Sequence, residues 1–172
     1  MGQGNEYRCT KRDYSFIAHL GVGFSFPMVY REAMEAAKNG EFGDKLQQFL
    51  LNHPEGAINC ESSIIRCSKC GHLACGPNFN MYLPKEGYDP ASVQHGQWCV
   101  AMPYEGADYV TPWELRENYK LTAKYPHKCE KCGSTARAIS EQTLARKIAE
   151  GSVVCPCCGG SMVVDECVIM WD

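Results

Sequence analysis

Twelve of the 172 residues are cysteine, and the spacing of six of them is typical of metal binding. These six form three CxxC pairs, each followed directly by a glycine: Cys67 and Cys70, Cys129 and Cys132, and Cys155 and Cys158. Two thiolates that are two residues apart can hold one tetrahedral ion when the backbone turns tightly around it. A glycine after the second cysteine tolerates the positive φ that such a turn needs. The three pairs are therefore interpreted as zinc knuckles.

The second and third pairs are predicted to share one zinc ion. Twenty-two residues lie between Cys132 and Cys155, and two knuckles at about this separation are a strong zinc signal. The predicted ligands are Cys129, Cys132, Cys155 and Cys158, which leaves Cys157 as a spare thiol beside the metal. A thioredoxin-type redox dithiol is the alternative, but it requires a βαβ context that surrounds neither pair.

A second zinc site is predicted from Cys9, Cys67 and Cys70. Cys9 stands where a knuckle would begin, but Arg12 takes the place of its second cysteine. A guanidinium group stays protonated and cannot bind zinc. The fourth ligand would then come from Cys60, Cys75, His72 or His19. Two alternatives remain: a local cluster of Cys60, Cys67, Cys70 and Cys75 without Cys9, and a decayed site that holds no metal.

Three segments carry helix signals. The first covers about residues 28–38, directly after Pro27, which suits a first helical position. A shorter helix is predicted over Asp44–Asn52. The third is predicted to be capped by Ser140 and ended by Gly151. The stretch 76–118 is rich in Pro, Gly and Tyr and is predicted to form loops and short strands.

These elements predict an α+β fold with two small zinc-ribbon-like β units, each with a helical insert between its knuckles. Each half of the chain runs from knuckle to strand, helical insert, strand and knuckle. The predicted domains are residues 1–118, with a two-helix insert and a loop-rich extension, and residues 119–172, with a one-helix insert. Neither half has a comfortable core of its own. Bound metal is therefore expected to be a condition of folding for the second half.

The motifs around the knuckles resemble a known type of protein. The pairs at Cys129 and Cys155, each followed by the pattern x2-Cys-Gly, resemble rubredoxin-type zinc ribbons. The N-terminal run, with Gly2, Gly4 and Cys9, is similar to that of uncharacterised bacterial tandem zinc-ribbon proteins, from whose pattern Arg12 departs. The resemblance implies a zinc-ribbon fold and one or two structural Zn²⁺ ions. It implies no activity.

Charge and hydropathy exclude several classes of protein. The net charge is −3, unlike that of a strongly basic nucleic-acid coat. No apolar run approaches the roughly 20 residues that span a bilayer, and the N-terminus lacks the apolar core of a signal peptide. The cysteines are therefore expected in a cytoplasmic protein, where metal or redox roles outweigh disulfides. No membrane association is expected.

No coherent catalytic set is found, so no enzyme activity is predicted. His53-Pro54-Glu55 matches the HxE triplet of zinc deaminases, in which Glu is the general acid/base. Only 11 residues separate Glu55 from Cys67, however, and the proline that should precede the first cysteine is missing. A zinc-dependent hydrolase or deaminase-like enzyme is kept as a remote alternative.

The predicted function is that of a zinc-stabilised protein-interaction module. Aromatic side chains in loops are frequent anchors of protein contacts. Six lie in the middle of the chain: Tyr82, Tyr88, Trp98, Tyr104, Tyr109 and Trp113. The alternative is nucleic-acid binding through a patch of Lys120, Lys124, Lys128 and Lys131, interleaved with Tyr119 and Tyr125. Bound thiolates make the chain more acidic than its formal charge, which weakens this alternative.

Overall fold

The chain divides into two compact units whose segments alternate along the sequence. The computed structural model describes residues 2–96, 98 and 109–171, with side chains described as far as Asp165. One unit, which we call the cysteine unit, comprises residues 1–21, 61–78 and 126–172. The other, the helical unit, comprises residues 22–60 and 79–125. This division differs from the expected boundary between residues 118 and 119, because the helical unit is inserted into the cysteine unit at two places.

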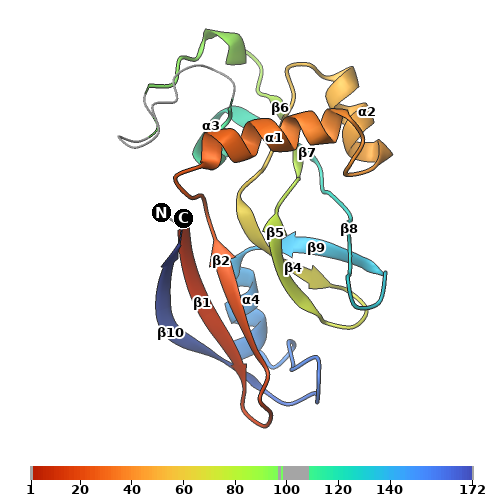
Figure 1. Ribbon diagram of the computed structural model, residues 1–172, viewed down its shortest axis with the longest axis vertical. Coiled ribbons are helices and arrows are strands. Elements are labelled where there is room, and N and C mark those ends of the chain that lie inside the picture. The colour runs from red at the N-terminus through yellow and green to blue at the C-terminus, as the bar shows by residue number, and fades with distance from the viewer. Residues whose placement is uncertain (1, 97, 99–108, 172) are drawn as a thin grey trace. The chain divides into compact units, whose positions relative to one another are not determined.

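The first sheet of the cysteine unit joins the two ends of the chain. Its antiparallel strands are β1 (Gly2–Cys9), β2 (Ser15–Leu20) and β10 (Met162–Trp171), in the order β10-β1-β2. The register sets Cys9 opposite Met162. The loop after β1 and the loop before β10 therefore meet at one end of this sheet, the lower end in Figure 1.

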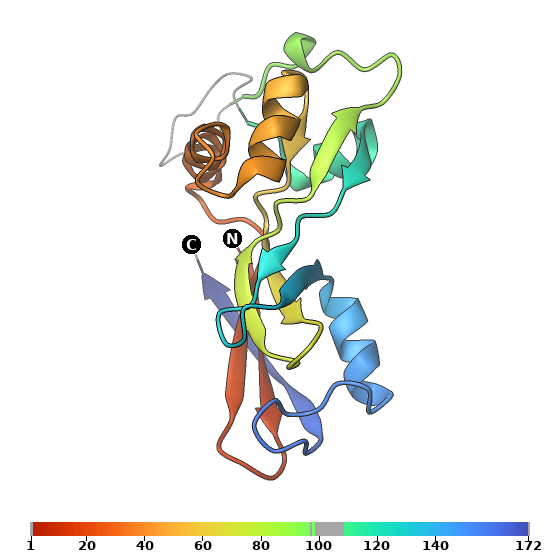
Figure 2. The same ribbon diagram turned by 90° about the vertical axis from the view of Figure 1, so that its right-hand side faces the viewer.

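The second sheet of the cysteine unit carries two hairpins. Its strands are β4 (Ser62–Cys67), β5 (Leu73–Pro77), β8 (His127–Lys128) and β9 (Thr135–Ile139), in the antiparallel order β5-β4-β9-β8. Each hairpin turn, between β4 and β5 and between β8 and β9, contains a CxxC pair. Because β4 pairs with β9, with Cys67 opposite Ala136, the two turns lie side by side (Figures 1 and 2).

Helix α4 (Glu141–Ala149) belongs to the cysteine unit and confirms the third predicted helix. The Ser140 hydroxyl accepts a hydrogen bond of 3.2 Å from the Thr143 N–H, as an N-cap does, and Gly151 follows the helix with φ +67°. Leu144 is fully buried. The core around it draws on both sheets and includes Tyr7, Ala18, Ile64, Leu73, Val153 and Met162.

The helical unit contains the first two predicted helices, α1 (Phe26–Lys38) and α2 (Asp44–Asn52). Pro27 stands in the first turn of α1, where its missing N–H leaves no helical hydrogen bond unmade. The three short strands β3 (Ala57–Ile58), β6 (Met81–Pro84) and β7 (Tyr119–Ala123) form a sheet in the order β3-β6-β7. A short 3-10 helix covers Pro90–Ser92.

The sequence did not predict α3 (Pro112–Asn118), which lies in the stretch expected to be loops and short strands. Thr111 and Glu114 form a capping box at its start. The Thr111 hydroxyl accepts from the Glu114 N–H at 3.2 Å, and the Glu114 carboxylate accepts from the Thr111 N–H at 2.8 Å. The sequence Thr-Pro-x-Glu was therefore the signal that could have predicted this helix.

The described part of the chain is a mixed α/β structure with four α-helices and antiparallel sheets. This agrees with the expected α+β class. Among the described residues, no helix is both long and apolar enough to cross a membrane.

The packing of α2 predicts opposite effects for two leucines of that helix. Leu46 is fully buried, whereas Leu51 is 62% exposed. Leu46→Ala should lower the free energy of unfolding by about 2–5 kcal/mol, because it leaves a cavity in the core. Leu51→Ala should lower it by less than about 0.5 kcal/mol. Urea denaturation of the metal-loaded protein measures both, and equal losses would contradict the observed orientation of α2.

Candidate metal centres

Four cysteines from the two hairpin turns converge on one point. We call Cys67, Cys70, Cys129 and Cys132 the four-cysteine centre. Their sulfur atoms all lie within 4.8 Å of one another. The Sγ atoms of Cys67 and Cys132 are 3.6 Å apart, as are those of Cys70 and Cys129. These distances far exceed a disulfide bond. They are close to the roughly 3.8 Å edge of a tetrahedron with zinc–sulfur bonds of about 2.3 Å.

Three further cysteines form a second group. We call Cys9, Cys155 and Cys158 the three-cysteine centre. Their sulfur atoms also lie within 4.8 Å of one another, and the Sγ atoms of Cys9 and Cys158 are 3.5 Å apart. Among the described residues, no further Cys, His, Asp or Glu places a ligand atom within that distance of all three. The two centres together contain the seven cysteines that the sequence singled out as ligands.

The knuckles pair differently from the prediction. The pair Cys129/Cys132 was expected to meet Cys155/Cys158, but it meets Cys67/Cys70. Cys9 was expected to join Cys67/Cys70, but it joins Cys155/Cys158. The physical reason is strand pairing: β4 pairs with β9, and β1 pairs with β10. One centre is therefore nested in sequence inside the other.

All four cysteine-bearing loops share one backbone frame. In each, the N–H of the first cysteine donates to the carbonyl oxygen five residues later. The four bonds are Cys9 to Tyr14 at 2.9 Å, Cys67 to His72 at 2.9 Å, Cys129 to Ser134 at 2.8 Å and Cys155 to Gly160 at 2.8 Å. The loop that carries Arg12 therefore closes with the same hydrogen bond as the three complete knuckles, although Arg12 stands where they have their second cysteine.

Glycine makes the three complete knuckles possible. Gly71, Gly133 and Gly159 follow the second cysteine of each pair with φ between +67° and +71°. Residues with a Cβ rarely adopt this conformation. The loop after Cys9 has Asp13 at the equivalent position, and Asp13 does not have a positive φ. This loop thus reaches the same closing hydrogen bond by a different local path.

Backbone N–H groups in these loops favour ionised thiols. The N–H of Ser134 lowers the pKa of Cys132 to about 6. The N–H of Lys11 lies 3.4 Å from the sulfur of Cys9 and lowers the pKa of that thiol. Metal binding requires deprotonated sulfur, which these N–H groups favour at Cys9 and Cys132. Burial and the neighbouring sulfurs act in the opposite direction at Cys70, whose pKa they raise to about 11, and at Cys158, whose pKa is also raised.

The residues considered as a fourth ligand lie elsewhere. Cys60 is buried in the core of the helical unit, and burial raises the pKa of its thiol well above the usual range. The sulfur of Cys75 accepts a hydrogen bond of 3.2 Å from the N–H of His19. His72 lines a pocket beside the four-cysteine centre. Cys99 and the side chain of Cys167, expected to be small buried hydrophobes, lie outside the described residues.

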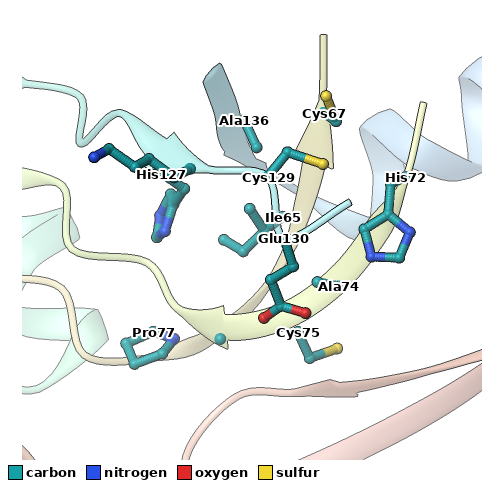
Figure 3. A pocket seen from close by; sticks show the side chains of 12 residues that line it. Ile65, Cys67, His72, Ala74, Cys75, Pro77, His127, Cys129, Glu130 and Ala136 are labelled. Carbon is teal, nitrogen blue, oxygen red and sulfur yellow. The ribbon is translucent and has the colours of Figure 1, made fainter. Parts of the chain in front are cut away.

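A shallow pocket of about 220 Å³ lies beside the four-cysteine centre (Figure 3). Cys67, Cys129, His72, Glu130 and His127 are among its lining residues. The Nε2–H of His127 donates a hydrogen bond of 3.1 Å to the Asn78 carbonyl oxygen, and burial lowers the pKa of this histidine. Because four thiolates fill a tetrahedral shell, the pocket would face a metal with no position left for a substrate.

No known protein-family model matches this chain, and no curated protein or solved structure is significantly similar to it. What the two centres can bind is therefore inferred from the geometry of their own residues.

The observed pairing predicts which cysteine substitutions remove the same metal ion. Cys129→Ser should release one ion, and adding Cys67→Ser should release no more, because both residues serve one centre. Adding Cys155→Ser to Cys129→Ser should release further metal. Elemental analysis of dialysed protein measures the metal content, and Cys60→Ser is the matched control that should leave it unchanged. The pairing would be wrong if Cys155→Ser alone removed the ion that Cys129→Ser removes.

Proposed function

We propose that this chain is a zinc-binding protein whose four-cysteine centre holds one structural Zn²⁺. The observation that carries the proposal is the convergence of Cys67, Cys70, Cys129 and Cys132, with Sγ separations of 3.6 Å. Thiolates select soft metals, and a tetrahedral set of four sulfurs favours zinc or an iron–sulfur cluster. The separation of 3.6 Å between sulfurs from opposite turns fits one zinc ion better than a cluster of several iron atoms.

The strands around this centre support a zinc-ribbon arrangement. Two hairpins, β4-β5 and β8-β9, each present a knuckle at the turn, and the pairing of β4 with β9 brings the turns together. The three-cysteine centre repeats part of this design, with the β1-β2 hairpin facing a loop closed by a bridge between Val154 and Ser161. The repetition is also what a tandem zinc-ribbon protein would have.

The zinc would act on stability rather than on a substrate. A closed shell of four thiolates is typical of structural sites, whereas catalytic sites keep an open position. Structural zinc contributes apparent binding free energies of roughly 10–16 kcal/mol in small domains. Such a contribution would hold the short strands β8 and β9 against β4.

We infer that the protein works as a protein-interaction module. The start of α1 and the turn before it carry three exposed apolar side chains: Phe24, in the turn, is 42% exposed, Met28 36% and Val29 43%. Exposed apolar groups that lie close together are a feature of protein contact sites. The net charge of −3 opposes binding to the phosphate backbone. Of the lysines in the expected patch, Lys120 and Lys124 belong to the helical unit and Lys128 and Lys131 to the cysteine unit.

Removal of zinc should selectively loosen the second sheet of the cysteine unit. A chelator should increase amide hydrogen exchange over residues 61–78 and 126–139, because these segments carry the four ligands. Added Zn²⁺ should restore protection, and added Mg²⁺, which prefers oxygen ligands, should not. Hydrogen exchange read by mass spectrometry measures both. Unchanged protection after complete metal removal would refute a structural role for the ion.

If the protein works as an interaction module, replacing the exposed apolar residues at and just before the start of α1 with serine should weaken partner binding. Partners captured by the wild-type chain should be lost with Phe24→Ser/Val29→Ser and retained with Leu51→Ser, whose side chain is 62% exposed elsewhere in the unit. Quantitative affinity purification measures the difference. The nucleic-acid alternative predicts instead that an oligonucleotide binds, that salt weakens this binding and that Lys124→Glu abolishes it.

A further inference from the structure

The three-cysteine centre differs from the four-cysteine centre in one ligand. Its first loop keeps the closing hydrogen bond of a knuckle, from the Cys9 N–H to the Tyr14 carbonyl oxygen at 2.9 Å. The position that bears the second cysteine in the other knuckles bears Arg12. A metal held by Cys9, Cys155 and Cys158 would therefore have three protein ligands, with its fourth position on the side of this loop.

Nothing in the described chain closes that position. Cys157, the nearest thiol in sequence, is exposed and does not belong to the group of converging sulfurs. Its own N–H instead donates to the sulfur of Cys155 at 3.4 Å. Arg12 and Cys158 are both exposed, so the side of the centre that faces this loop can be reached from solvent.

Positive charge lies beside the centre. The N–H of Lys11 lies 3.4 Å from the Cys9 sulfur, and the Lys11 side-chain carbons and the Cys158 sulfur both lie close to Gly160. Arg12 adds a second cation in the same loop. Three thiolates and one Zn²⁺ together carry a net charge of −1. The two cations favour a further anionic donor, and a soft donor matches the sulfur shell.

We propose that the three-cysteine centre binds a metal ion and that the open fourth position takes a thiolate from outside the chain. The inference rests on the proposed zinc-binding function. On binding, a metal–sulfur bond forms, the water that otherwise fills the position leaves, and the thiol proton passes to bulk water. The thiolate comes from a small-molecule thiol or from a cysteine of another protein.

Cobalt substitution tests the open position. Apo protein is reconstituted anaerobically with Co²⁺, whose thiolate charge-transfer absorption grows with the number of sulfur ligands. Glutathione and a 20-residue peptide with one central cysteine are then titrated in separate arms. We expect saturable growth of the charge-transfer band. Growth with glutathione alone indicates a site limited to small thiols, and growth with both indicates a site that a protein cysteine can reach.

Substitutions at Arg12 provide the matched pair. Arg12→Ala leaves the position open and should still respond to added thiol. Arg12→Cys supplies the fourth thiolate, so the response should vanish and the Co²⁺ affinity of this centre should rise at least about tenfold, since even changes to residues that only hydrogen-bond to a metal ligand alter affinity ~10- to 100-fold. Cys157→Ser should respond as the wild type does. Cys155→Ser removes the centre and gives the baseline spectrum of the four-cysteine centre.

The outcomes separate this inference from the proposed function. Two bound Co²⁺ ions with no response to either thiol would overturn the open position, as would complete loss of the thiol response in Arg12→Ala, which removes one cation but leaves the position open. One bound ion, insensitive to Cys155→Ser, would overturn the inference and leave the structural zinc proposal standing. No bound ion at all would overturn the proposed function itself.

Discussion

The structure of the cysteine unit depends on one constraint: sulfur atoms from distant segments must meet within the reach of one ion. In the four-cysteine centre this fixes the register of β4 against β9, with Cys67 opposite Ala136. A slip by one residue would turn the side chains of a strand to the opposite face and separate the turns. A metal ion bound at this centre would thus specify a strand pairing between residues that are some 70 positions apart.

The nesting of the two centres explains how the helical unit is attached. Residues 22–60 leave the cysteine unit after β2 and return before β4, and residues 79–125 leave after β5 and return before β8. Each insertion therefore connects two strands of the cysteine unit. The pairing of β1 with β10 joins the two ends of the chain, which carry the cysteines of the three-cysteine centre.

Local chemistry made part of this structure predictable from sequence. Six of the seven cysteines in the two centres could be recognised from their CxxC spacing, and the seventh, Cys9, from its knuckle-like surroundings. The helices α1, α2 and α4 could be recognised from the positions of their apolar residues, together with Pro27 for α1 and Ser140 for α4. The pairing of knuckles could not be predicted, because spacing is equally compatible with neighbouring and nested arrangements. Strand register decides it, and register is a long-range property. The helix α3 was missed because a Pro- and Tyr-rich context obscured the capping box at Thr111.

Cys129 and Cys132 converge with Cys67 and Cys70 rather than with Cys155 and Cys158, so a metal ion would be shared within the first set. NMR of the cadmium-substituted protein tests it most directly, through scalar correlations between the metal nucleus and the cysteine β-protons. We expect one cadmium resonance that correlates with the cysteines of the four-cysteine centre and a separate one that correlates with those of the three-cysteine centre. A single cadmium resonance that correlates with both Cys129 and Cys155 would contradict it.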